Sequence, residues 1–192
     1  STNKNLAHNF ILKRCLAFYN KSKGFDQNST AGSITIYNCS SHENGSWEYM
    51  LNSSGVTYAP GSIFTVKNTV AVSQKSSTFK TGTVMESNNF AAGESNCTSL
   101  DTAGSSGRRS IFGNLPDLDF MHLQTNPKSN LIDAGVLIDG IVYTGSKPDL
   151  GCFEVGILLS DKEILQETKD ISLFPNPVAD IVHYIARGPI GE

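Results

Sequence analysis

Short runs in which apolar and polar residues alternate recur along the first part of the chain. Each run holds two short stretches separated by a polar residue and a small residue or a cysteine, and the runs occupy residues 11–18, 34–41 and 64–72. Alternation with a period of two predicts β-strands rather than helices. Aligning Arg14, Asn38 and Asn68 gives offsets of 24 and 30 residues. A strand pattern that recurs at this spacing predicts the coils of a β-solenoid.

Equivalent positions of neighbouring coils stack on one another in such a fold. Cys15 is therefore expected above Cys39 in the interior, either as buried thiols or as a disulfide. Asn38 is expected above Asn68 as a rung of amide side chains at a corner. The longer second interval is explained by a loop over residues 52–62, which are rich in Ser and Gly.

The repeat weakens after about residue 73. Residues 87–90 and 99–109 are expected as loops, and residues 115–123 as a strand that follows a proline turn. Later segments, at 130–135 and 148–154, are expected to close the solenoid, which would hold about six coils and a cap. The domain prediction is a solenoid over residues 1–157, a charged and polar linker over 158–170, and a new segment over 171–192.

Composition agrees with a turn-rich β protein. Ser, Asn and Gly make up 56 of 192 residues, charged residues are 17 %, and the net charge is -3. An average soluble chain has about 25 % charged residues, so this chain is not expected to bind nucleic acid by neutralising phosphates. The longest apolar run has about five residues, too few to cross a bilayer, and no membrane insertion is expected. Because Ser1 is not preceded by Met or followed by an apolar leader, either a leader has been removed or the chain begins within a longer protein.

Several kinds of site are unsupported by the spacing of reactive residues. The four cysteines form no C-x-x-C pair, which argues against a zinc cluster. The histidines are scattered without the partners of a catalytic triad; they are His8, His42, His122 and His183. Trp47 and Tyr49 lie two residues apart, on one side of a strand, and either stack on sugar rings or are buried.

Residues 17–28, Ala-Phe-Tyr-Asn-Lys-Ser-Lys-Gly-Phe-Asp-Gln-Asn, followed by Ile-Thr-Ile-Tyr-Asn-Cys at 34–39, resemble polysaccharide lyase family nine. These proteins are right-handed parallel β-helix pectate lyases. Residues 130–135 together with 145–154 look like the C-terminal closure of the same proteins, in which Ala is more usual at the position of Cys152. The resemblance covers about residues 6–155 and implies an all-β fold, a right-handed parallel β-helix of which this chain is the C-terminal portion.

The resemblance implies a secreted enzyme that cleaves polygalacturonate by calcium-assisted β-elimination. The lysine base of the family matches Lys23. A free lysine has a pKa of about 10.4, so a lysine base must lose its proton through desolvation or nearby positive charge, which calcium and Lys21 would supply. Substrate-binding candidates are Lys21, Arg14, Asp26 and Arg108; the basic ones line a cleft for an anionic polymer or belong to solvated surfaces.

Calcium binds through several hard oxygen ligands, chiefly carboxylates. In the family the acidic cluster lies about one coil before the lysine, which here falls upstream of residue 1, and residues 1–22 contain neither Asp nor Glu. No metal site is expected within this chain. The chain alone is therefore predicted to be inactive or nearly so.

A second resemblance involves the tail. Phe174-Pro175-Asn176-Pro177-Val178 with Asp180 looks like the start of the C-terminal sorting domain of the type nine secretion system. It implies secretion machinery as a partner and a secreted or cell-surface location in a Gram-negative bacterium. Two alternatives to the lyase stay open: a non-catalytic β-helix that binds carbohydrate or acts as a surface adhesin, and another β-helix lyase or hydrolase, whose hydrolytic carboxylate pair would also lie upstream.

Overall fold

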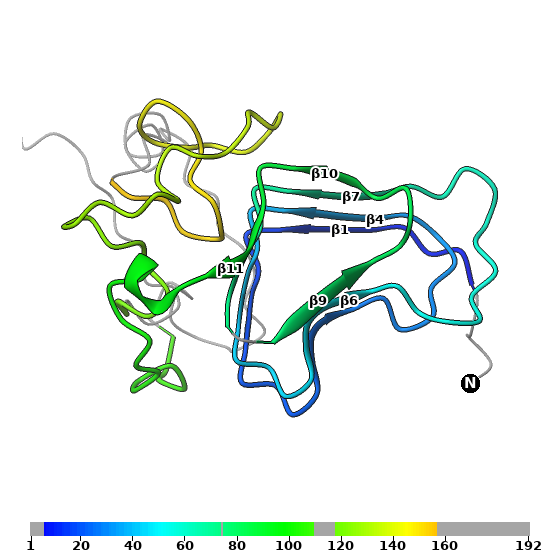
Figure 1. The fold of residues 1–192 in the computed structure, drawn as a ribbon, viewed down its shortest axis with the longest axis horizontal. Helices are drawn as coiled ribbons and strands as arrows, with labels where there is room; N and C mark the ends of the chain where they lie inside the picture. Colours follow the sequence, from blue (N-terminus) through cyan, green and yellow to red (C-terminus); the bar gives the residue numbers. More distant parts are fainter. Residues whose placement is uncertain (1–5, 74, 110–117, 157–192) are drawn as a thin grey trace, which may run out of the picture. The chain divides into compact units, whose positions relative to one another are not determined.

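Short parallel strands, stacked in three sheets, make up the first half of the protein. The computed structural model describes residues 6–73, 75–109 and 118–156. Sheet A contains, in spatial order, β1 (Phe10–Lys13), β4 (Ile34–Tyr37), β7 (Phe64–Lys67) and β10 (Val84–Glu86). Sheet B contains β11 (Asn89–Ala92), β8 (Val70–Val72), β5 (Ser40–His42) and β2 (Leu16–Phe18), and sheet C contains β3 (Lys23–Asp26), β6 (Trp47–Leu51) and β9 (Ser76–Phe79). Figure 1 shows the strands of each sheet running side by side, and this architecture confirms the predicted parallel β-helix.

The register of sheet A confirms the predicted repeat. Phe10 pairs with Ile34, and Ile34 pairs with Phe64, which reproduces the offsets of 24 and 30 residues. The residue after each strand turns the chain from sheet A to sheet B with a positive φ: 51° at Arg14, 47° at Asn38 and 53° at Asn68. Asparagine adopts this left-handed conformation at lower cost than most residues. Residues 52–63 contain no strand and form the predicted loop between β6 and β7.

The interior of the coils is apolar and well packed. Ile36, Val66 and Ala71 are buried there, and the rings of Phe25 and Tyr49 stack with centroids 4.9 Å apart. The predicted stack of cysteines is confirmed, because the backbone N–H of Cys15 donates to Sγ of Cys39 at 3.4 Å. Both are free thiols, so the disulfide alternative is wrong for this structure.

One more regular coil follows the three that the repeat identified, and then the coils stop. Residues 87–90, expected as a loop, contain the turn at Ser87 (φ 49°) and the start of β11. Residues 115–123, expected as a strand, form only isolated bridges at Phe120 and Leu123 in their described part. In the described residues, sheets A and B hold four strands each and residues 97–156 add none to them, so the expectation of about six coils is wrong.

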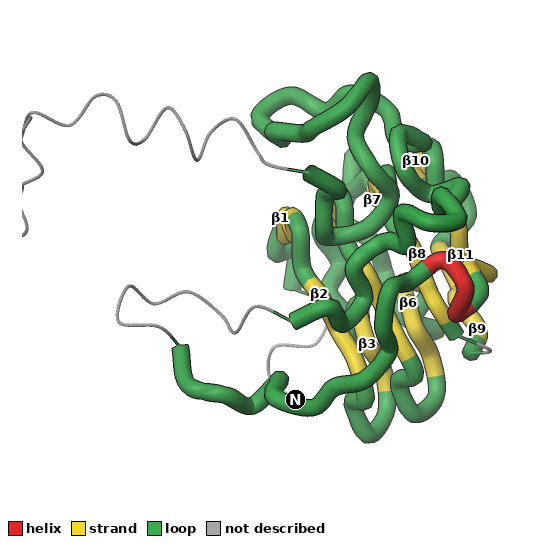
Figure 2. Tube along the Cα trace, turned by 90° about the vertical axis from the view of Figure 1, so that its left-hand side faces the viewer, coloured by secondary structure: helices red, strands yellow, loops and turns green. Residues whose placement is uncertain are grey.

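Irregular chain after the short 3-10 helix η1 (Glu94–Asn96) packs against the outer face of sheet B. Val70 and Val72 of that sheet are buried against Phe120, Leu131 and Leu150. Figure 2, turned toward this side of the molecule, shows mainly loops beside β2 and β8. The apolar outer face of sheet B thus explains why the predicted closing segments fold back along the coils.

Amide side chains fasten this closing segment to the corner between sheets A and B. Nδ2 of Asn68 donates to Oδ1 of Asn38 at 3.3 Å and to the carbonyl of Val136 at 2.8 Å. Oδ1 of Asn68 accepts from the backbone N–H of Val136, also at 2.8 Å. The predicted asparagine rung is confirmed, and it also binds the closing segment at Val136, which lies 68 residues after Asn68.

The described residues also bear on membrane insertion and on the predicted C-terminal segments. No helix among the described residues has the length and apolar character required to cross a membrane. The predicted linker at 158–170 and the segment at 171–192 lie outside the described residues.

Candidate functional site

The outer face of sheet C presents Lys23 because its strands do not alternate regularly. In β3, Phe25 packs in the interior and Gly24 faces the interior at the corner between sheets B and C. In β6, the consecutive residues Glu48 and Tyr49 are both fully buried. The pairing of β6 with β9 shifts register between Trp47 and Tyr49, which marks a β-bulge in β6. In β3 the two adjacent inward residues leave Lys23 and Asp26, three positions apart, both facing outward.

The same bulge separates the two aromatic residues that were expected on one side of a strand. Tyr49 is buried with its hydroxyl donating to the carbonyl of Val70 at 3.0 Å. Trp47 is partly exposed and belongs to neither hydrophobic cluster. The shared-face expectation is wrong, and of the two residues only Trp47 lies on the face that carries Lys23.

A buried polar network lies behind this face. The carboxylate of Glu48 accepts hydrogen bonds from the backbone N–H of Asn44 at 3.1 Å, from Nδ2 of Asn44 at 2.7 Å, and from the hydroxyl of Ser41. Gly24 lies directly against this network: a Cβ there would be 2.5 Å from the Ser41 hydroxyl and 2.7 Å from the Glu48 carbonyl. The glycine after the lysine is therefore required by packing and not by an unusual φ.

The network also supports the turn that carries the two candidate lysines. Oδ1 of Asn44 accepts from the backbone N–H of Asn20 at 3.0 Å and from its Nδ2 at 2.8 Å. The backbone N–H of Gly45 donates to the carbonyl of Asn20 at 2.8 Å. The second coil thus supports the turn of the first, and the backbone that leads into Lys23 is held by hydrogen bonds from the next coil.

Two of the five predicted site residues are in contact here, and a third lies close to them in the chain. Nζ of Lys23 donates to Oδ2 of Asp26 at 2.9 Å, and their side chains are 32 % and 29 % exposed. The other oxygen of Asp26 accepts from the backbone N–H of Asn28 at 3.1 Å. Lys21 is exposed on the turn two residues before Lys23. The lysine is thus on the surface, oriented by one carboxylate, with a second cation nearby in the chain.

The other two candidates lie elsewhere. Arg14 is at the corner between sheets A and B, where its guanidinium donates to the carbonyl of Val142 and approaches the buried carboxylate of Glu154 at 3.5 Å. It fastens the closing segment, as the asparagine rung does. Arg108 is exposed in the loop that follows η1. Their proposed contacts with substrate stay predictions.

The described residues do not supply a calcium site by themselves. Among them, no group of three or more His, Cys, Asp and Glu side chains is arranged to hold a metal ion. Asp26 is a single carboxylate already paired with Lys23. A calcium site here would need additional carboxylates.

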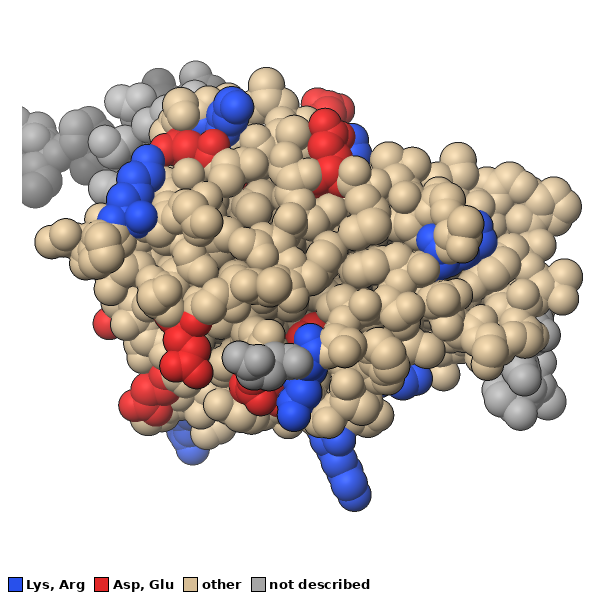
Figure 3. Space-filling model, in the orientation of Figure 1, with Lys and Arg blue, Asp and Glu red and all other residues tan. Residues whose placement is uncertain are grey.

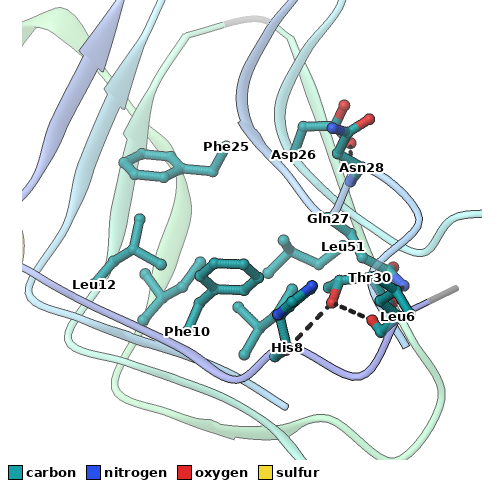
Figure 4. Close-up of a pocket in the computed structure, with 12 residues that line it drawn as sticks. Leu6, His8, Phe10, Leu12, Phe25, Asp26, Gln27, Asn28, Thr30 and Leu51 are labelled. Carbon is teal, nitrogen blue, oxygen red and sulfur yellow. Dashed lines mark hydrogen bonds between the residues drawn. The ribbon is translucent and has the colours of Figure 1, made fainter. Parts of the chain in front are cut away.

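A cavity elsewhere in the described chain has a different character. It has a volume of about 430 Å³ and lies at the end of the coils near β1, lined largely by apolar side chains that include Phe10, Leu12 and Phe25. Figure 4 shows the rings of Phe10 and Phe25 pointing into it, with Asp26 at its edge. An acidic polymer would have to lose its hydration there without compensating cations. The charged face of sheet C is the better candidate.

Charges elsewhere are sparse. On the face seen in Figure 3, lysines and arginines are scattered, several of them beside acidic side chains, and no continuous basic surface is present. This distribution agrees with the low charged fraction of the sequence.

The three stacked sheets of parallel strands define the class: this chain is part of a parallel β-helix protein. No family model matches the chain. It is 36 % identical over 155 residues to pectate lyase L of Dickeya chrysanthemi and 38 % identical over 151 residues to pectate lyase L of Dickeya dadantii. These matches span 76 % of this chain and 33 % of each relative.

A solved structure gives the same relationship. Pectate lyase Pel9A superposes with a TM-score of 0.66 at 37 % sequence identity, over 77 % of this chain and 36 % of that one. The chain is therefore related to the pectate lyases, of which it spans about a third of the length.

One residue of the face was undervalued by the sequence interpretation. Trp47 follows Lys23 by 24 residues, the same offset that separates the first two coils, and the two residues pair in register. Applying the repeat to the lysine would have placed the tryptophan beside it.

Proposed function

We propose that this chain is part of a secreted pectate lyase that cleaves polygalacturonate by β-elimination, with Lys23 as the base. The position of Lys23 carries the proposal: a lysine on an outer face of a β-helix, directly after a turn held by the next coil, in a chain similar to pectate lyases. Lys21 and Asp26 would orient the acidic sugar and the amine.

The reaction divides into proton removal and bond cleavage. An uncharged Nζ of Lys23 takes the proton from C5 of a galacturonate residue, the C4–O bond breaks, and a double bond forms between C4 and C5. The released sugar oxygen takes a proton from solvent. For Lys23 to act, its hydrogen bond to Asp26 must be exchanged for contact with the C5 proton, and side chains about one-third exposed leave room for that exchange.

Calcium is proposed as the cofactor, with its carboxylate ligands upstream of residue 1. Bound to the substrate carboxylate, it would make the C5 proton more acidic. Because the described residues hold no such ligand set, the chain alone is proposed to have little or no activity.

The substrate and the location follow from the same relationship. An acidic polysaccharide such as polygalacturonate is proposed as the partner, and the protein is proposed to act outside the cell or on the surface of a Gram-negative bacterium. The tail at 171–192 would engage the secretion machinery.

The test compares the product of the whole gene with this chain. Ultraviolet absorbance of unsaturated products is expected from the longer protein with calcium, and not from the chain alone. Lys23→Ala in the longer protein should lower kcat at least about 100-fold, the usual contribution of a positioned base. Lys147→Ala, which removes an exposed lysine of the closing segment, is the matched control. Undiminished activity in Lys23→Ala, or after chelation of calcium, would contradict the mechanism.

A second function has one observation in its favour. The pairing of Lys23 with Asp26 is also what a surface that binds sugars without cleaving them would show. In that case the longer protein would bind polygalacturonate and release no unsaturated product.

A further inference from the structure

Trp47 lies directly beside Lys23 on the outer face of sheet C. The two residues are Cα partners in the parallel pairing of β3 with β6, and neighbouring strands lie about 4.8 Å apart. Ser76 of β9 is the partner of Trp47 on its other side. A row of side chains, Lys23, Trp47 and Ser76, therefore crosses the sheet.

The tryptophan has no place in the core of the protein. It is partly exposed, and it is absent from both hydrophobic clusters and from the ring contacts of the described residues. Its backbone N–H is 3.4 Å from the Ser22 carbonyl in the preceding coil, which ties it to the turn before Lys23. A large aromatic ring that the core does not use offers a flat surface for a ligand.

Polar and cationic groups flank this ring. The hydroxyls of Ser22 and Ser46 are 3.3 Å apart, in the turns just before the lysine and the tryptophan. Lys75 is exposed immediately before Ser76, and Lys21 is exposed in the first coil. The row thus begins at Lys23 and ends at Ser76, which follows an exposed lysine in the chain, and the aromatic ring lies between them.

We infer that Trp47 forms a sugar-binding subsite, in which its indole stacks on the apolar face of a galacturonate residue next to the one at Lys23. The inference rests on the proposed function for the class of sugar. Sugar rings bury their C–H face against an aromatic ring while their hydroxyls and carboxylates stay hydrated or bind polar groups. Lys75 and Lys21 provide the positive charge that an acidic sugar chain lying across the strands requires.

The chain contains one tryptophan, so its fluorescence reports on this residue alone. Titration of the 192-residue chain with trigalacturonate is expected to change the emission in a saturable way. The neutral galactose trimer should bind at least about tenfold more weakly, because it lacks the carboxylates. No saturable change with trigalacturonate would overturn the subsite.

Substitution separates stacking from mere proximity. By calorimetry, Trp47→Ala should weaken trigalacturonate binding about tenfold, and Trp47→Phe should recover most of it because a smaller ring still stacks. Tyr37→Ala, which removes a partly exposed aromatic ring from sheet A, is the matched control and should bind as the wild type does. Equal binding by Trp47→Ala and the wild type would overturn the inference.

The outcome is independent of the catalytic proposal. Lys23→Ala tests the base through product formation, whereas Trp47→Ala tests the subsite through binding without turnover. Loss of binding in Trp47→Ala together with full catalysis in Lys23→Ala would refute the role of Lys23 as the base and support the subsite. Unchanged binding in Trp47→Ala together with loss of catalysis in Lys23→Ala would support the base and refute the subsite.

Discussion

Replacing Gly24 by alanine is expected to disrupt the buried polar network behind Lys23 while leaving the lysine itself unchanged. The new methyl group would be 2.5 Å from the Ser41 hydroxyl, 2.6 Å from Nδ2 of Asn44 and 2.7 Å from the Glu48 carbonyl. Contacts this short do not occur, so β3 has to move away from β6 or the buried network has to open. Overpacking costs about 1–3 kcal/mol, and an unsatisfied buried polar group costs about 1–3 kcal/mol more.

The expected loss is therefore about 3 kcal/mol in the free energy of unfolding, against a total of about 5–15 kcal/mol for ordinary domains. Equilibrium urea unfolding followed by circular dichroism measures it. Gly93→Ala is the matched control, since its φ is -85° and the nearest atom to its Cβ is 3.7 Å away; a change within about 0.5 kcal/mol is expected. A loss below about 1 kcal/mol in Gly24→Ala would refute the role assigned to the network.

Two further predictions concern the closing segment. Asn68→Ala removes the side chain that hydrogen-bonds both the N–H and the carbonyl of Val136. It should lower the free energy of unfolding by about 2–4 kcal/mol in the same assay. No loss would mean that the asparagine rung does not hold the closing segment. Burial raises the pKa of Glu154 to about 7 from its usual 4.5; this group's stabilising contribution is therefore fully present below about pH 4.5 and is lost as the pH rises through 7. Between pH 5 and 8 the wild type should lose about 1–2 kcal/mol from this group once solvent screening is allowed for, and Glu154→Gln should flatten that part of the profile; an unchanged profile would contradict the raised pKa.

Much of the fold could be predicted from the sequence because a solenoid repeats its environment. The offsets between Arg14, Asn38 and Asn68 reappear in the strand register, and Cys15 stacks on Cys39 as the alignment requires. When polar residues recur at the corners of each coil and apolar residues recur inside it, the coils can be predicted from a single sequence. The fourth coil at 84–92 was missed because β10 is exposed and carries little alternation.

The course of the later chain could not be predicted in the same way. Residues 118–156 are held by contacts over long separations, such as those of Asn68 with Val136 and of Arg14 with Glu154. Their own sequence contains few strand signals, and the surface that they cover is formed by Val70 and Val72, in coils far back in the chain. Local pattern says little about a segment whose conformation is set by its distant partners.

The candidate site shows why one local irregularity mattered more than the overall fold. Strict alternation in β6 puts Trp47 and Tyr49 on the same face, and then either both are buried or both bind sugar. The bulge at Glu48 and Tyr49 turns two residues inward, where the carboxylate closes a hydrogen-bond network and the ring completes the core. Trp47 is then left outside beside Lys23. The buried network behind this face leaves room for no side chain at position 24, so that residue must be glycine. Lys23 and Trp47 thus lie on neighbouring strands of one outer face, where the proposed base and an aromatic ring are side by side.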